Sequence, residues 1–199
     1  MRAAEHRGLD RLTGMHAFEH RSAWLEHPNY QTQALLLESH DSFVAMAASL
    51  EERCRRIGGG EGLTERQVKR FAGRLADQFR NWQWAMACHE RYEENKLYPF
   101  LEERFGVDCA VLADEHEALH QRADACIRTL EKAAAACQAG EGFPELQVLS
   151  VLRDYRLALC AHLDREEQLV IPLLLSMSPA DFSSYAGKES CAVPAAPPQ

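Results

Sequence analysis

The chain has 199 residues, of which 46% are hydrophobic and 26% are charged, as in an ordinary globular domain. Its formal net charge of −8 argues against nucleic acid or an anionic membrane as the main partner. Seven cysteines without a C-x-x-C pair indicate free thiols, and neither a disulfide framework nor a zinc–thiolate site. No apolar run is long enough to span a bilayer and the start lacks a secretory signal, so we expect a cytoplasmic protein.

Four segments with helical periodicity follow one another, each bounded by the few helix breakers in the chain. The first covers residues 31–57 and stops at three glycines. The second starts after Thr64, whose Thr-Glu-Arg-Gln sequence fits a capping box, and covers 64–104. The third covers 108–140 and the fourth 144–177. Because short connections between long helices make them antiparallel neighbours, the sequence predicts an all-α fold, an up-down four-helix bundle.

The two ends of the chain fall outside these helices. Residues 1–29 contain Phe18 and Trp24, and we expect them to form an N-terminal arm or a short helix lying on the bundle. The bundle itself is predicted to cover residues 30–177. Residues 178–199 end in Ala-Val-Pro-Ala-Ala-Pro-Pro-Gln, which is typical of a flexible, disordered tail.

The second half of the predicted bundle repeats the first. Residues 89–101 align without gaps with residues 162–174, and both read H-x-x-x-E-E-x-x-x-x-P followed by two apolar residues. One histidine lies on the preceding helix of each half, His40 in the first and His116 in the second. Each half is therefore a helical hairpin, and two such hairpins form a bundle with a pseudo-twofold axis.

Six histidines and glutamates occupy positions that the periodicity assigns to the core. They are His40, His89, Glu93, His116, His162 and Glu166. Residues four apart share one face of a helix, so each H-x-x-x-E pair can close on one metal ion. Two carboxylates buried among Leu and Phe require compensating positive charge, which a pair of metal ions supplies.

Taken singly, these residues have other interpretations. One histidine on an apolar stripe is more often a hydrogen-bonded core residue, and one His/Glu pair can be a surface ion pair that stabilises little. The repetition of the pattern over four helices favours metal binding instead. Nitrogen and carboxylate donors without thiolate suit iron or manganese pairs better than zinc.

The H…HxxxE…EH…HxxxE arrangement over residues 31–177 resembles the hemerythrin-like (HHE cation-binding) family. The resemblance implies a non-haem di-iron centre with the same six ligands, in which both carboxylates bridge the two iron ions beside an oxo or hydroxo group. His120 stands one turn after His116, where oxygen-carrying hemerythrins have a further ligand. The resemblance therefore implies His120 as a seventh ligand, and the alternative is a neutral surface histidine.

The last carboxylate departs from the oxygen-carrying pattern. Those proteins have an aspartate five residues after the last histidine, whereas Glu166 follows His162 at four, as in intracellular hemerythrin-like proteins and iron-centre repair proteins. Glu94 and Glu167 come directly after the two ligand glutamates and are expected to face outward or to support the ligands. If His120 binds, one iron keeps a single open position. Without it both irons are open, which favours redox turnover or labile iron.

These features predict a di-iron protein that binds or senses dioxygen, nitric oxide or peroxide. No nucleophile, phosphate loop or substrate motif indicates a conventional enzyme. One alternative is a redox-active protein that reduces peroxide or nitric oxide, or supplies iron for the repair of iron centres. Another is iron storage, or an interaction with a protein partner through the acidic surface and the tail.

Overall fold

The fold is that of a computed structural model, and its described residues are helical with no strand. The structure describes residues 24, 26–27, 34–59, 62–178, 180–181 and 185. Its helices are α3 (Ala34–Gly59), α4 (Glu65–Tyr92), η3 (Glu93–Leu97), α5 (Tyr98–Phe105), α6 (Ala110–Ala139) and α7 (Glu145–Leu175).

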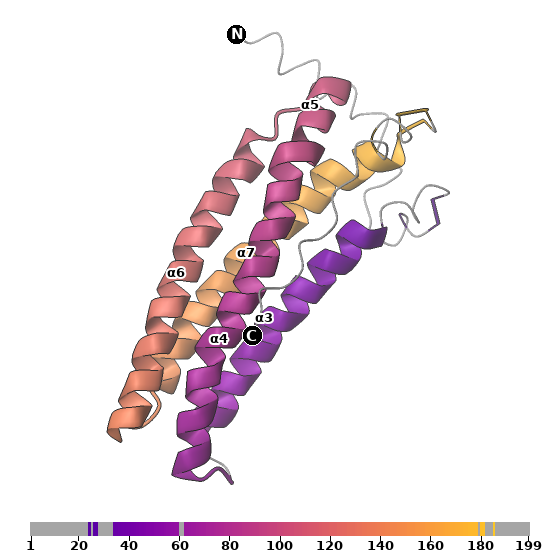
Figure 1. Cartoon of the computed structure of the whole chain (residues 1–199). Helices are drawn as coiled ribbons and strands as arrows, with labels where there is room; N and C mark the ends of the chain where they lie inside the picture. Colours follow the sequence, from indigo (N-terminus) through magenta and orange to yellow (C-terminus); the bar gives the residue numbers. More distant parts are fainter. Residues whose placement is uncertain are drawn as a thin grey trace.

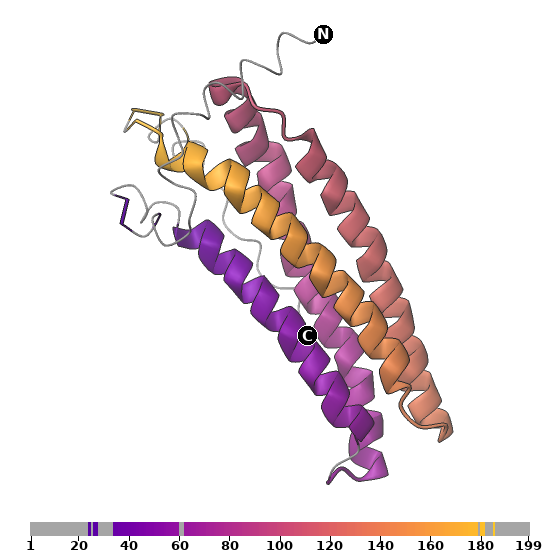
Figure 2. The same ribbon diagram turned by 180° about the vertical axis from the view of Figure 1, so that it is seen from behind.

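Four long rods lie side by side and are joined by short connections (Figure 1). The second rod consists of α4, η3 and α5, which follow one another without a break. α3 and α6 each pack against both α4 and α7, so the rods form a closed ring, and Figure 2 shows α3 beside α7 from behind. The predicted all-α four-helix bundle is confirmed. None of the helices in the described part of the chain is long and apolar enough to cross a membrane.

Local signals fix where the rods begin and end. The predicted capping box is present at the start of α4: the Thr64 backbone N–H donates to Gln67 Oε1 (2.8 Å), and the Gln67 N–H donates to Thr64 Oγ1 (3.3 Å). Gly106 ends α5 and Gly140 ends α6, each in the left-handed conformation (φ 69° and 85°) that glycine adopts without steric cost.

One turn of the second rod is wider than an α-helical turn. In η3 the Tyr98 N–H donates to the Glu93 carbonyl, an i to i−5 bond typical of a π-helix. Pro99 follows, and its missing N–H removes an α-helical bond to the preceding turn. Pro172, its counterpart in the repeat, lies within the continuous α-helix α7. The two halves of the bundle therefore differ at this point, which the sequence pattern did not predict.

The core consists of two apolar clusters with a polar layer between them. One cluster lies toward the α3–α4 and α6–α7 connections and includes Phe79, Leu130 and Leu159. The other lies toward the opposite end of the rods and includes Leu101 and Leu174. On α4, α6 and α7 the predicted ligand positions lie where the first cluster ends and the second begins. On α3, His40 lies between Phe43 of the first cluster and Leu37, which belongs to a small third cluster with Trp24. The apolar packing on both sides therefore holds the polar layer at a fixed level of the bundle.

Most of the expected arm and tail lies outside the described residues. Trp24, from the expected arm, is buried against Leu37 and Leu175. From the segment beyond 178, Asp181 accepts two hydrogen bonds from Arg104 (2.7 and 3.0 Å), and Tyr185 packs against the second apolar cluster. The chain beyond residue 178 therefore contacts α5 at these positions.

The capping box leads to a stability prediction. Thr64→Ala removes the N-cap and should lower the free energy of unfolding by about 1 kcal/mol. Thr129→Ala is the matched control, because its hydroxyl donates only to the Ala125 carbonyl within α6 and such bonds contribute little. Urea denaturation of the metal-free variants measures both changes. Equal losses in the two variants would contradict the role assigned to the cap.

Candidate metal centre

Six predicted ligand residues converge in the polar layer, and each of the four rods contributes one histidine. They are His40 on α3, His89 on α4, Glu93 on η3, His116 on α6, and His162 and Glu166 on α7. All are buried except His89, whose side chain is 14% exposed. Such a concentration of ionisable groups in a helical core indicates a functional site.

Two pairs of histidines face each other across the layer. Nε2 of His40 lies 3.1 Å from Nε2 of His89, and Nε2 of His116 lies 3.1 Å from Nε2 of His162. Donor atoms that share a metal ion at bond lengths of about 2.1 Å stand about 3 Å apart when they subtend a right angle. Each histidine pair therefore fits one metal ion.

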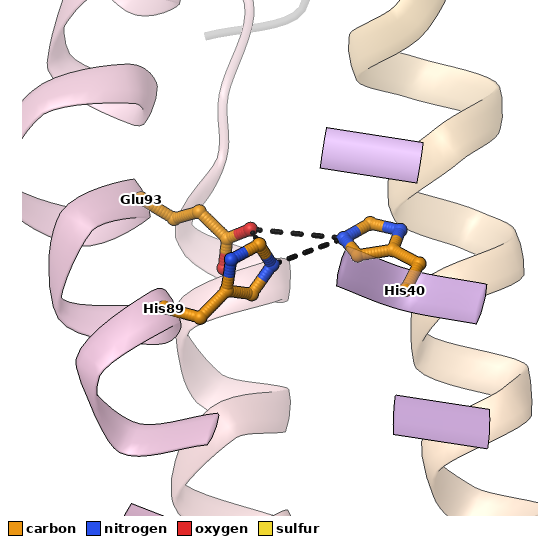
Figure 3. A group of neighbouring side chains, drawn as sticks. All are labelled: His40, His89 and Glu93. Carbon is orange, nitrogen blue, oxygen red and sulfur yellow. Dashed lines mark hydrogen bonds and ion pairs between the residues drawn. The ribbon is translucent and has the colours of Figure 1, made fainter. Parts of the chain in front are cut away.

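The first pair shares its space with a carboxylate (Figure 3). Oε1 of Glu93 lies 2.7 Å from Nε2 of His89 and 3.8 Å from Nε2 of His40. These three side chains can place one ligand atom each within 4.8 Å of the others. They form a cluster of the size that a metal ion requires.

Each carboxylate reaches both histidine pairs. Oε2 of Glu93 lies 3.5 Å from Nε2 of His116, while its Oε1 faces His89. Oε2 of Glu166 lies 3.4 Å from Nε2 of His40 and 3.9 Å from Nε2 of His162. A carboxylate between two donor pairs is placed to bridge two metal ions.

Several oxygen atoms in this layer lack hydrogen-bond partners. Both oxygens of Glu93 and Oε2 of Glu166 are buried and accept no hydrogen bond of good geometry, although the nitrogen of His89 is close to Glu93. A buried, unpartnered carboxylate oxygen is costly, and metal coordination removes that cost. The donor set therefore fits a metal pair.

The glutamates that follow the two ligand glutamates support histidines of neighbouring rods. Oε1 of Glu167 lies 3.1 Å from Nδ1 of His40, and Oε1 of Glu94 lies 2.8 Å from Nδ1 of His116. A carboxylate at Nδ1 holds the proton there and leaves the Nε2 lone pair free for metal. The repeated Glu-Glu pair thus has two roles, one residue facing the centre and the next orienting a ligand.

His162 is supported in the same way by a residue that the sequence pattern did not single out. Oε2 of Glu115 lies 3.0 Å from Nδ1 of His162, and Arg165 pairs with the other oxygen of Glu115. Glu115 directly precedes His116 and belongs to neither H-x-x-x-E-E motif. Glu115 is the glutamate of the EH element in the family arrangement, but because it has no counterpart in the other half no role was assigned to it.

Tyr98 is a second residue that sequence reasoning missed. Its hydroxyl donates to Oε1 of Glu166 (2.9 Å) and lies 3.5 Å from Nε2 of His116, whose ring is stacked on the phenol. Burial raises the pKa of Tyr98, so the phenol stays protonated and acts as a donor. Its counterpart in the repeat is Ile171, which packs in an apolar cluster. The π-turn of η3 brings Tyr98 to the centre.

The structure does not bring His120 together with the other six. Its side chain is 42% exposed, and its Nε2 lies 2.5 Å from Oε2 of Glu90. Glu90 is itself buried (3% exposed). Their counterparts in the other half are Val44 and Leu163, which belong to the apolar core. The asymmetric histidine is thus matched by an equally asymmetric glutamate, which the sequence pattern did not reveal as its partner.

The comparison with known families agrees with this geometry. The family model described as the hemerythrin HHE cation binding domain matches residues 31–174, which include all six converging residues. The chain belongs to this family. Hemerythrin-like domains bind metal cations, typically iron, and this chain has a His/Glu cluster of the kind that could hold one. No curated protein and no solved structure matches the chain significantly.

The two central carboxyls of this hemerythrin-like chain titrate differently in the metal-free protein. Burial opposes ionisation of Glu93, but the nearby imidazoles of His40 and His89 outweigh it and lower its pKa to about 2. Burial and the neighbouring Glu93 charge raise the pKa of Glu166 well above its usual range. The two carboxyls therefore differ, because Glu93 loses its proton at lower pH than Glu166 does.

The histidines are also unequal. Burial lowers the pKa of His40, but the hydrogen bond with Glu167 and the nearby carboxylates outweigh it and raise the pKa to about 9. Burial and the charge of His116 lower the pKa of His162 to about 4. His40 therefore carries a proton at neutral pH, whereas His162 is ready to bind metal.

Metal affinity should rise with pH. A metal ion has to displace the proton of His40, and the raised pKa of about 9 of this side chain means that this competition ends only above that pH. Between about pH 7 and about pH 9 the apparent affinity should increase by up to about tenfold per pH unit for each proton displaced. Chelator-competition titrations, corrected for the chelator's own protonation, measure it. A pH-independent affinity would show that no proton is displaced.

The carboxylates that support the histidines give a second prediction. Glu167→Gln and Glu94→Gln should each weaken metal binding by about 10- to 100-fold, because the amide does not hold the Nδ1 proton as a carboxylate does. Glu103→Gln is the matched control, since Glu103 is exposed on α5 and away from the centre. The same competition titration compares the three variants. Unchanged affinity in Glu167→Gln and Glu94→Gln would remove the supporting role.

Proposed function

We propose that this hemerythrin-like chain is a non-haem di-iron protein that binds or senses dioxygen, nitric oxide or peroxide. The proposed ligands are His40, His89, Glu93, His116, His162 and Glu166. Two equivalent histidine pairs joined by two carboxylates carry the proposal. Imidazole and carboxylate donors without thiolate suit iron better than structural zinc. Iron bound there would supply the redox-active centre to which the small ligand attaches.

The surroundings of the centre support a small ligand. Five of the six residues are buried and have apolar clusters on either side, so little of their surface is open to a large substrate. The described cysteines are all free thiols, and four of them are buried. They support the proposed location in the reducing cytoplasm.

One observation favours a second function. Because His120 pairs with Glu90, each metal position has two histidines and shares the same two carboxylates. Neither metal position then has a full set of protein ligands. Such open positions suit redox turnover of peroxide or nitric oxide, or donation of iron for repair. Optical spectra under nitrogen, air and peroxide separate the two functions. A reversible oxy spectrum supports binding, whereas rapid peroxide consumption or irreversible oxidation supports turnover.

The ligand set leads to a direct mutational prediction. Glu166→Ala and Glu93→Ala should each reduce the iron content from two ions per chain to one or none, because each removes a bridge. His120→Ala should retain both ions if the surface pairing with Glu90 persists in the loaded protein. Iron analysis after desalting measures the content. Loss of one iron in His120→Ala would return His120 to the ligand set.

A further inference from the structure

A hollow in the surface leads to one side of the metal centre. It has a volume of about 430 Å³ and lies between η3 and α5 on one side and α6 on the other. Its lining includes His116 and Tyr98, both of which are buried, together with the exposed residues Glu102 and Glu117. The groove therefore ends at the buried side chains of His116 and Tyr98, beside the His116–His162 pair.

We propose that the groove is the entry route for a small, uncharged ligand, and that the Tyr98 hydroxyl, which donates to Glu166 in this structure, turns to donate its hydrogen bond to that ligand at the His116–His162 pair when the ligand is bound. This inference rests on the proposed di-iron function and deepens it. It assigns the exchangeable position to one of two otherwise equivalent halves. It also gives a role to Tyr98, which is not one of the six ligands.

The position of Tyr98 supports this role. Its hydroxyl lies between Oε1 of Glu166 (2.9 Å) and Nε2 of His116 (3.5 Å), and its side chain forms part of the groove wall. At this place the hydroxyl borders both the groove and the His116–His162 pair, which would hold one of the proposed metal ions. The other half has Ile171 at the equivalent position, which offers no hydrogen bond.

The pairing of His120 leaves this position available. His120 lies on α6 one turn from His116 and also lines the groove, but its Nε2 is held by Glu90. A third histidine on this metal would occupy the position that the groove reaches. With His120 held aside, a ligand arriving through the groove meets a metal with only two histidines.

The charge of the groove selects the kind of ligand. Four carboxylate residues line it, namely Glu94, Glu102, Asp114 and Glu117. Their combined field repels anions and has no effect on neutral molecules such as nitric oxide, dioxygen or hydrogen peroxide. The groove therefore favours neutral diatomic molecules and peroxide over anions such as azide.

Obstruction of the groove tests the route. Ala113 and Ala110 line it, and both lie on α6. Ala113→Phe and Ala110→Trp should slow the association of nitric oxide with the di-iron(II) protein by about tenfold or more, while both iron ions are retained. Ala135→Trp is the matched control on an exposed part of α6 and should bind at the wild-type rate. Stopped-flow absorbance gives the association rates. If Ala113→Phe does not load iron, the rate measured for Ala110→Trp alone tests the route.

The hydroxyl of Tyr98 is tested separately. Tyr98→Phe should retain two irons and speed nitric oxide dissociation by about three- to tenfold, the effect of losing one hydrogen bond. Tyr155→Phe removes another buried hydroxyl, one that donates to Gln83, and should leave dissociation unchanged. Mössbauer spectra of the wild type with nitric oxide should show a change at one iron only, and the two iron signals should become more alike in Tyr98→Phe.

The proposed repulsion of anions by the groove carboxylates is tested by changing the salt concentration and using azide as the anion. Raising the ionic strength should speed azide association with the diferric protein, because salt screens the carboxylates, and should leave nitric oxide association unchanged.

Wild-type nitric oxide rates in both groove variants, or unchanged dissociation in Tyr98→Phe, would overturn the inference while the di-iron function stands. A wild-type protein that loads two irons but binds neither probe would overturn the inference and the proposed ligand binding together. One that does not load two irons would overturn the di-iron function itself.

Discussion

Two carboxylates in the middle of a helical bundle set the conditions for the rest of the molecule. Glu93 and Glu166 are completely buried, and three of their four oxygens have no hydrogen-bond partner. Removing an ionised carboxylate from water costs several kcal/mol unless opposite charge lies nearby. In the metal-free centre the burial and the mutual charge of the two groups raise the pKa of Glu166, which opposes its ionisation. The proposed metal ions would allow both carboxyls to be ionised, and the surrounding histidines are placed to hold such ions.

The pseudo-twofold arrangement explains how one short motif builds so much of the centre. In each Glu-Glu pair the first carboxylate faces the two histidine pairs and the second lies at Nδ1 of a histidine on the neighbouring rod. The symmetry is broken at two places, by the π-turn that brings Tyr98 inward and by the pair of His120 with Glu90. Both asymmetric features lie on the side of His116. Identical ligands can therefore have different surroundings, and the difference lies in residues that do not belong to the motif.

The sequence predicted most of the scaffold because each signal was local and repeated. Periodicity and the capping box at Thr64 gave the helices, and the duplicated motif gave the six converging residues. The position of Tyr98 was not predictable, because a π-turn shifts side chains by one residue relative to the α-helical period. The pairing of His120 was also missed, since it depends on a glutamate from another rod that looks like a surface residue. Glu115 was missed for the same reason.

The most direct test of this account is the metal stoichiometry of the purified chain, measured together with its Mössbauer spectrum. The account predicts two iron ions per chain, magnetically coupled through shared bridges, and the loss of that coupling when either Glu93 or Glu166 is replaced by alanine. A chain that holds a single metal ion, a tightly bound zinc ion or no metal at all would contradict it.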